Sequence, residues 1–211
     1  MKKVLAIMIS LIILTGSILV ISYMKADASQ KSIAEKVIRF HVIANSDSTE
    51  DQALKLKVRD NVLKYISPKL KNSKSIEESR EIIKENNYEI NKIAVKTIEE
   101  NGYTYTVKSK LSHENFPVKT YGNITLPQGN YEAYRIIIGN GQGHNWWCVM
   151  FPPLCFTDIT KGDVEVKKTD EMMKKTLSKE EYELVNDDVE KNNLVFKFKI
   201  AEKIKEACKS K

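Results

Sequence analysis

The segment 139–156 constrains the fold more than any other part of this 211-residue chain. Its sequence, GNGQGHNWWCVMFPPLCF, holds both tryptophans, two of the three cysteines and three of the eight glycines. Glycines at alternate positions allow a sharp turn or a close approach to another surface. The paired indoles offer a large, rigid contact area with a polar N–H on each ring. We expect a glycine loop that leads into a strand over 145–151, with these side chains either in the core or in a binding site.

The N-terminus has the features of an export signal. A lysine pair precedes an apolar stretch over 4–21, and the tripeptide ADA at 26–28 fits the small-x-small pattern of a cleavage site. The stretch exceeds a usual signal-peptide core and just reaches membrane-spanning length. We therefore expect residues 1–28 to be a signal peptide or an N-terminal membrane anchor, and the sequence leaves cleavage open.

Translocation would permit disulfides, and two cysteines lie close together in the sequence. Cys148 and Cys155 are separated by six residues that include the pair Pro152-Pro153. A proline bend can bring the two Cα atoms within bridging distance. We predict this bridge over the alternative of two buried thiols, which leaves Cys208 as an odd thiol near the C-terminus.

The sequence of the N-terminal half of the domain predicts one strand and two helices. The strand is expected over 37–44, and the first helix begins after Ser48 and ends before Pro68. A capping box at 75–78 begins the second helix, for which an interruption at Asn86 stays open.

Several hairpin strands follow over 103–151, where β-branched and aromatic residues alternate between tight turns. This order of elements predicts an α+β fold, with a mostly antiparallel sheet and two N-terminal helices on one face, preceded by the signal or anchor helix. We place the domain at 29–160, a charged variable insert at 161–192, and a strand and helix that complete the domain at 193–211.

Charge and motif patterns argue against several kinds of function. The net charge is +6, but lysine and glutamate are interspersed along the chain, so nucleic-acid binding is not expected. The alternating glycines lead into tryptophans and not into a helix, which argues against a phosphate site. A zinc site from His144, Cys148 and Cys155 lacks the paired short-range ligands of common structural sites. We expect no cofactor and no metal.

Polar residues at the expected strand-to-helix junction mark a second candidate site. Spacings of four between Asp51, Lys55 and Arg59 allow an ion-pair ladder, and a capped helix with such a ladder explains Ser48, Asp51 and Lys55 well. It explains His41 and Asn45 poorly, and these two residues would instead support the glycine loop through hydrogen bonds.

Three blocks of sequence carry a resemblance to a known family. They are HVIANSD at 41–47 with matching positions up to Asp60, YGN at 121–123 with matching positions up to Gly139, and the segment 141–156. Together they span about 37–158 and resemble the stage II sporulation protein R family of endospore-forming Gram-positive bacteria.

The resemblance implies an exported signalling protein that is not itself an enzyme. In that family, the protein is made in the forespore and crosses into the space between the forespore and mother-cell membranes. There it activates a membrane-embedded aspartic protease of the mother cell, which processes pro-sigma-E. The expected partner is that protease, and the chain is expected to be secreted or anchored through its N-terminal helix.

We expect the partner to be contacted by residues of the polar junction, the glycine loop and the tryptophan pair: His41, Asn45, Asp47, Arg59, Gly141, Gly143, Asn145, Trp146 and Trp147. Strand alternation places the two indoles on opposite faces, so one is expected in the core and the other as an anchor. Two alternatives stay open. One is an exported cysteine-dependent hydrolase, and the other is a cell-wall-binding protein that stacks sugars on the tryptophans.

Overall fold

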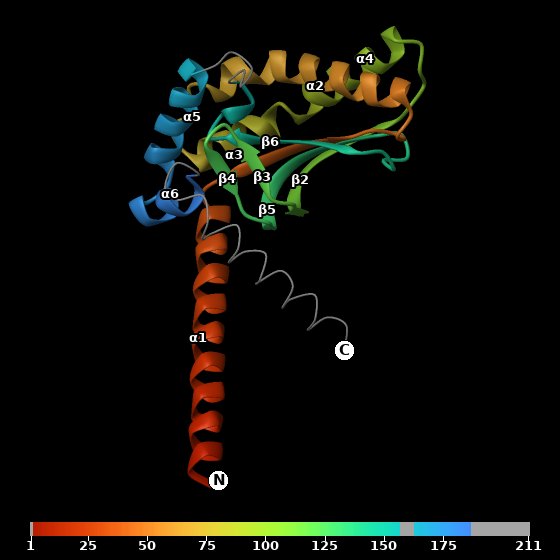
Figure 1. Ribbon diagram of the computed structural model, residues 1–211. Coiled ribbons are helices and arrows are strands. Elements are labelled where there is room, and N and C mark those ends of the chain that lie inside the picture. Colours follow the sequence, from red (N-terminus) through yellow and green to blue (C-terminus); the bar gives the residue numbers. More distant parts are fainter. Residues whose placement is uncertain (1, 157–162, 187–211) are drawn as a thin grey trace.

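A four-stranded sheet forms the centre of the domain in a computed structural model that describes residues 2–156 and 163–186 (Figure 1). The strand order is β2-β5-β1-β6. The bounds are Ile38–Ile43 for β1, Val107–Phe116 for β2, Gly129–Ile138 for β5 and Asn145–Phe151 for β6. A separate hairpin consists of β3, Lys119–Tyr121, and β4, Ile124–Leu126.

The sheet is mixed, which corrects the expectation of a mostly antiparallel sheet built from hairpins. β1 pairs with β6 and β2 pairs with β5 in antiparallel fashion, but β1 and β5 run parallel at the centre. The reason is the long crossover after β1, which carries the chain to β2 at the edge. β5 then returns between β2 and β1, in the direction of β1.

Three helices cover one face of this sheet, where two were expected. They are α2, Thr49–Leu70, α3, Ile76–Glu85, and α4, Asn87–Glu100. The side chains of Ser48 and Ser75 accept hydrogen bonds from the third residues of α2 and α3, as the capping patterns predict. Asn86 separates α3 from α4, and its side-chain oxygen accepts a hydrogen bond from Tyr65, 2.6 Å away, on α2.

Pro68 lies inside α2, so the prediction that the helix ends before it was wrong. The proline removes one i→i−4 hydrogen bond of the last turn, yet the helix continues through it. Lys71 still donates its N–H to the Ser67 carbonyl at 2.9 Å, and the fully buried Leu70 holds the helix end in the core.

The main core lies between the sheet and these helices. Phe40 and Val42 of β1 face the same way as Tyr134 and Ile136 of β5. They are buried together with the apolar stripes of α2 and α4, which consist of Leu54, Val58, Val62, Ile66, Ile90, Ala94 and Ile98. These side chains recur at three- or four-residue intervals, which is the spacing of one face of a helix.

A single long helix, α1, runs from Lys2 to Ala34 and extends away from the domain on the side of the sheet opposite α2 and α4 (Figure 1). Its inner end packs against the domain, where Ile33 is fully buried. Its outer part exposes apolar side chains such as Leu14 and Ile21. Among the helices that the structure describes, none is both long and apolar enough to span a bilayer. The signal or anchor role of residues 1–28 stays a prediction.

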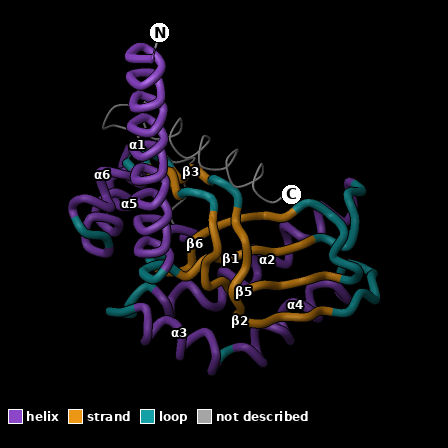
Figure 2. The backbone as a smooth tube through the Cα atoms, turned by 90° about the horizontal axis from the view of Figure 1, so that it is seen from below, coloured by secondary structure: helices purple, strands orange, loops and turns teal. Residues whose placement is uncertain are grey.

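Two further helices, α5, Asp163–Thr176, and α6, Lys179–Val185, fall in the segment expected to be a charged insert. Figure 2 shows them grouped with α1 beside the sheet. Glu181 of α6 accepts hydrogen bonds from Ser32, 2.5 Å away, and Lys36, 2.6 Å away, so α6 is attached to the inner end of α1. The strand and helix expected at 193–211, together with Cys208, lie outside the described residues.

Candidate functional site

Two loops meet at one end of the sheet. The loop 44–48 joins β1 to α2, and the loop 139–144 joins β5 to β6. Because β1 and β5 are parallel, their C-terminal ends lie side by side. The backbones are in direct contact there, since Gly143 N–H donates to the Ala44 carbonyl at 3.0 Å and Gln142 N–H donates to the Asn45 carbonyl at 3.2 Å.

Asn45 links the glycine loop to α2, as the sequence predicts. Its side-chain oxygen accepts the Asn140 N–H at 3.0 Å, and its amide donates to Asp51 Oδ2 at 2.8 Å. Ser46 Oγ donates to the same carboxylate oxygen at 2.6 Å. Burial raises the pKa of Asp51, but hydrogen bonds from Ser46, Asn45 and Tyr105 together outweigh it, so the pKa is lowered. Asp51 is therefore a buried anion at the centre of the junction.

A second link joins the two loops through Asp47. Asp47 Oδ1 accepts the backbone N–H of His144 at 2.5 Å and lies 2.5 Å from its Nδ1. These two hydrogen bonds lower the pKa of the exposed Asp47 carboxyl, the backbone one more than the side-chain one. From α2, the buried Lys55 donates to the His144 carbonyl at 2.9 Å. The position of His144 is thus fixed from both sides.

The expected ion-pair ladder along α2 does not form among the described residues. Asp51 accepts hydrogen bonds from Asn45 and Ser46, and Lys55 donates to Gln52 at 2.5 Å. Arg59 pairs with its neighbour Asp60 at 2.7 Å. The helix uses these charges to hold the two loops, a role that helical spacing alone does not indicate.

Two glycines allow this close approach. Gly141 has φ +63°, a left-handed conformation that favours glycine. Gly143 has an ordinary φ, but a Cβ at this position would collide with the Ser46 carbonyl and the Ala44 side chain. A side chain at either position would therefore displace the glycine loop from the junction.

The two tryptophans lie on opposite faces of the sheet, as predicted. The Trp146 ring faces α2, with the Arg59 guanidinium 4.8 Å from its centroid and the Phe40 ring 5.8 Å away. Trp147 lies on the face away from α2 and α4. Both indoles are partly buried and packed against the core, so burial alone does not distinguish a core indole from an anchor. Asn145, also half-buried, begins the same strand.

His41 supports Trp147 and not the glycine loop. Its ring is stacked on Trp147, with centroids 5.0 Å apart and planes 3° apart. Neither ring nitrogen has a hydrogen-bond partner among the described residues, so the expected hydrogen bonds to the glycine loop do not form. Burial, which outweighs the charge of nearby Glu114, lowers the pKa of His41 to about 4.

Arg39, which the sequence analysis did not select, lies next to this stack. Its side chain is fully buried, and the guanidinium carbon is 4.4 Å from the Phe116 centroid and 4.9 Å from the Tyr131 centroid. Its Nη2 donates to the Tyr121 hydroxyl at 3.1 Å, and its Nε and Nη1 have no hydrogen-bond partner among the described residues. The aromatic residues around it come from β2, β3 and β5. Their separate positions in the sequence do not predict that they converge on one arginine.

The predicted disulfide between Cys148 and Cys155 is confirmed, with the Cα atoms 5.7 Å apart. It joins β6 to a short 3-10 helix, Leu154–Phe156, across Pro152-Pro153, and the Phe151–Pro152 peptide bond is cis. The bridge leaves neither sulfur as a thiolate, so a hydrolase using either one would have no nucleophile while it stands. Within residues 2–156 and 163–186, no three His, Cys, Asp or Glu side chains are grouped to hold a metal.

The regions matched by known proteins include these two loops and β6. The family model for stage II sporulation protein R (spore_II_R) matches residues 34–161. A relative from Bacillus subtilis (strain 168), described as Stage II sporulation protein R, is 41% identical over 195 residues, which cover 90% of this chain and 85% of the relative. No solved structure matches the chain.

Proposed function

The chain belongs to the stage II sporulation protein R family, and from this membership we propose that it is the exported signal that activates a membrane-embedded aspartic protease of the mother cell. Membership alone makes it a sporulation protein. The proposal adds that the chain leaves the forespore, meets its receptor in the space between the two membranes, and so triggers the processing of pro-sigma-E.

The observation that supports a binding role is the network of hydrogen bonds between the two loops, together with the disulfide. Asn45 and Asp47 hold the glycine loop by hydrogen bonds, Asp51 fixes Asn45, and the disulfide ties β6 to the 3-10 helix that follows it. These groups build a preorganised surface, which lowers the cost of binding. A ligand of this kind activates a receptor by fitting its active state better than its idle state.

We place the centre of the contact surface at Trp147. It lies on the edge strand β6, on the face away from α2 and α4, where its ring packs against His41 and Phe116. Partly buried aromatic side chains are frequent hot spots of protein interfaces. His41 is only 3% exposed, so it acts by positioning the indole and does not itself touch the partner. Arg59 lies on the other face, against Trp146, and is expected to contribute less.

The test is reconstitution of the full chain with vesicles that contain the protease, with cleaved sigma factor as the readout. Trp147→Ala is expected to lower activation about tenfold or more, because a central aromatic anchor is lost. Trp146→Ala is the matched control, since it removes the same side chain from the opposite face.

Both variants are first checked for a folded state by thermal melting, because both indoles pack against the core. Full activation by folded Trp147→Ala, or an equal loss in Trp146→Ala, would contradict the assignment. Activation that requires a free thiol at Cys148 or Cys155 would favour the hydrolase alternative.

A further inference from the structure

We propose that the groove beside strand β2 binds an extended, acidic segment of a protein partner, which adds to the sheet as a further strand. This inference goes beyond the proposed function and does not depend on the identity of the receptor. It concerns a different part of the molecule, at the edge of the sheet away from Trp147.

The first observation is the edge itself. β2 is ten residues long and pairs with β5 along its whole length, and within the described residues no strand lies on its other side. An edge strand presents a row of backbone N–H and C=O groups without partners, which an extended peptide can satisfy. Addition of a peptide to such an edge is a recurrent mode of recognition.

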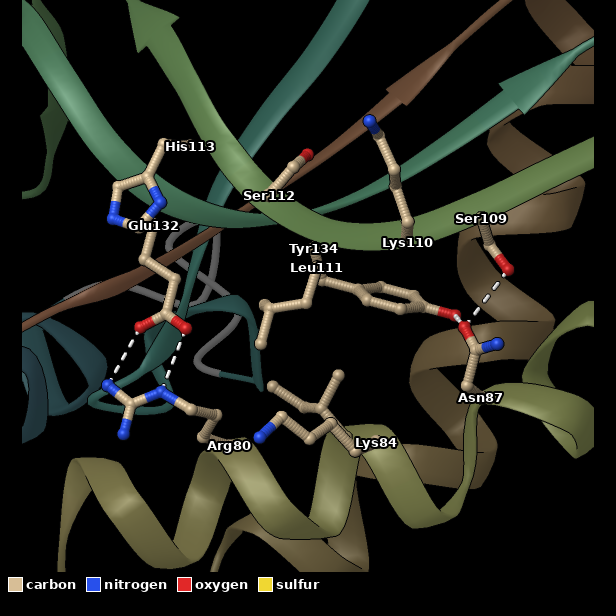
Figure 3. Close-up of a pocket in the computed structure, with 11 residues that line it drawn as sticks. Arg80, Lys84, Asn87, Ser109, Lys110, Leu111, Ser112, His113, Glu132 and Tyr134 are labelled. Atoms are coloured by element: carbon tan, nitrogen blue, oxygen red, sulfur yellow. Dashed lines mark hydrogen bonds and ion pairs between the residues drawn. The ribbon is translucent and has the colours of Figure 1, made fainter.

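The second observation is a cavity of about 490 Å³ between this strand and α3 (Figure 3). Its floor is formed by Ile83, Leu111 and Tyr134, which are apolar or aromatic. Where an edge strand runs beside a helix, backbone hydrogen bonds supply affinity, and a pocket takes the alternate side chains of the added strand. This floor is suited to one apolar side chain of the bound segment.

The groove is held open by polar contacts at both ends. At one end, the Tyr134 hydroxyl and the Ser109 hydroxyl both donate to Asn87 Oδ1, at 2.8 and 3.2 Å, which fixes the start of α4 against the sheet. At the other end, the Arg80 guanidinium binds the Glu132 carboxylate through two hydrogen bonds of 2.8 and 2.9 Å. Figure 3 shows both contacts flanking the apolar floor.

The third observation is charge. Glu132 is the only acidic residue among those that line the groove, and Arg80 already neutralises it. Lys84 lies at the rim, and Glu81, its exposed ion-pair partner, is not among the residues that line the groove. The local charge is therefore positive, which favours acidic side chains on the groove side of the bound strand.

The opposite side of the added strand would also meet positive charge. Lys108 and Lys110 of β2 are exposed, and Figure 3 shows Lys110 directed away from the groove floor. Acidic residues beside these lysines form favourable cross-strand pairs. A second copy of β2 paired parallel and in register would instead set Lys108 and Lys110 against the same lysines, which disfavours that pairing.

The experiment selects random nine-residue peptides on the immobilised full chain in detergent micelles. We expect enrichment of peptides with alternating acidic residues around one apolar residue. The best such peptide should bind saturably, and its version with lysine for every acidic residue should bind at least tenfold more weakly. Methylation of alternate backbone nitrogens should also abolish binding, because the added strand loses its donors.

The variant K84E/K110E should bind the acidic peptide at least tenfold more weakly and should prefer the lysine version. K92E/K96E makes the same charge change on the exposed side of α4, outside the groove, and should bind as the wild type does. Enrichment of basic peptides, no enrichment, or unchanged binding by K84E/K110E would overturn the proposal. So would a concentration-dependent dimer that K84E/K110E alters, because it would assign the edge to a second copy.

Discussion

At the scale of single residues, β1 buries two polar side chains in different ways. Arg39 lies against aromatic rings, whose faces attract the cation. His41 is stacked on Trp147 and meets the Phe116 ring edge to face, and its nitrogens have no hydrogen-bond partner among the described residues. The neutral imidazole tolerates this environment, whereas the charged form does not. His41 therefore ties the stability of the sheet to pH.

The pH dependence of unfolding should reveal this histidine. Burial lowers the pKa of His41 from 6.5 to about 4, so the unfolded chain binds more protons between these values. The free energy of unfolding should have its full value above pH 6.5 and should fall by up to about 3 kcal/mol as the pH drops towards 4. His41→Phe keeps an aromatic ring on Trp147 and should lose this part of the pH dependence.

Chemical denaturation at several pH values measures the effect. The difference between wild type and His41→Phe isolates His41 from the carboxylates that titrate in the same range. Parallel pH profiles for the two proteins would contradict the prediction.

Some of these residue roles were predictable from the sequence and others were not. Asn45 directly follows a strand and precedes a helix, so its role in holding a neighbouring loop follows from local order. The environment of His41 and Arg39 depends on Phe116, Tyr121, Tyr131 and Trp147, which come from distant strands. Strand alternation showed which face each residue occupies, but not what covers that face.

At the scale of elements, β6 is the strand on which the candidate site depends. Its first residues follow the glycine loop, and the disulfide ties its later part to the 3-10 helix. On the chain-entropy model, closing so short a loop stabilises the folded state by about 2–3 kcal/mol. The bridge therefore keeps the end of β6 in place beside β1.

Removal of the bridge should lower the free energy of unfolding by this amount. The double variant Cys148→Ser/Cys155→Ser and the reduced wild type should show the same shift of the denaturation midpoint. Cys208→Ser serves as a control for thiol exchange and should retain the sensitivity to reductant. A midpoint that does not change in the double variant would show that the bridge contributes nothing to stability.

The elements themselves followed closely from local signals, and their pairing did not. Ser48 and the capping box at 75–78 identified the starts of two helices. The parallel pairing of β1 with β5 was missed, because it depends on where the chain returns after three helices. Pro68 was misjudged since local rules do not include the buried Leu70 that holds the helix end.

At the scale of the whole molecule, α1 has two parts with different roles. The inner end contributes the buried Ile33 and, with Lys36 just beyond it, contacts Glu181 of α6. The outer part extends away from the domain (Figure 2), and apolar side chains such as Leu14 and Ile21 are exposed on it. Cleavage after Ala28 would therefore leave the packed end with the domain.

Two truncations test this division. A chain that begins at Ser29 should unfold with nearly the same midpoint as the full chain in the same detergent. A chain that begins at Val37 loses Ile33 and both contacts with Glu181, and its free energy of unfolding should fall by roughly 3 kcal/mol. Equal destabilisation by both truncations would show that the outer part also supports the fold.

The continuity of α1 has a mechanical consequence. From Gly16 to its last residue, Ala34, the helix has no further glycine and no proline, the usual sites of a kink. The domain is thus joined to the outer segment of α1 by a rigid helix and not by a flexible linker. If a lipid bilayer held that segment, the stiff helix would fix the orientation of the Trp147 face of the sheet relative to the membrane. A receptor in that membrane would then meet the domain in a single orientation.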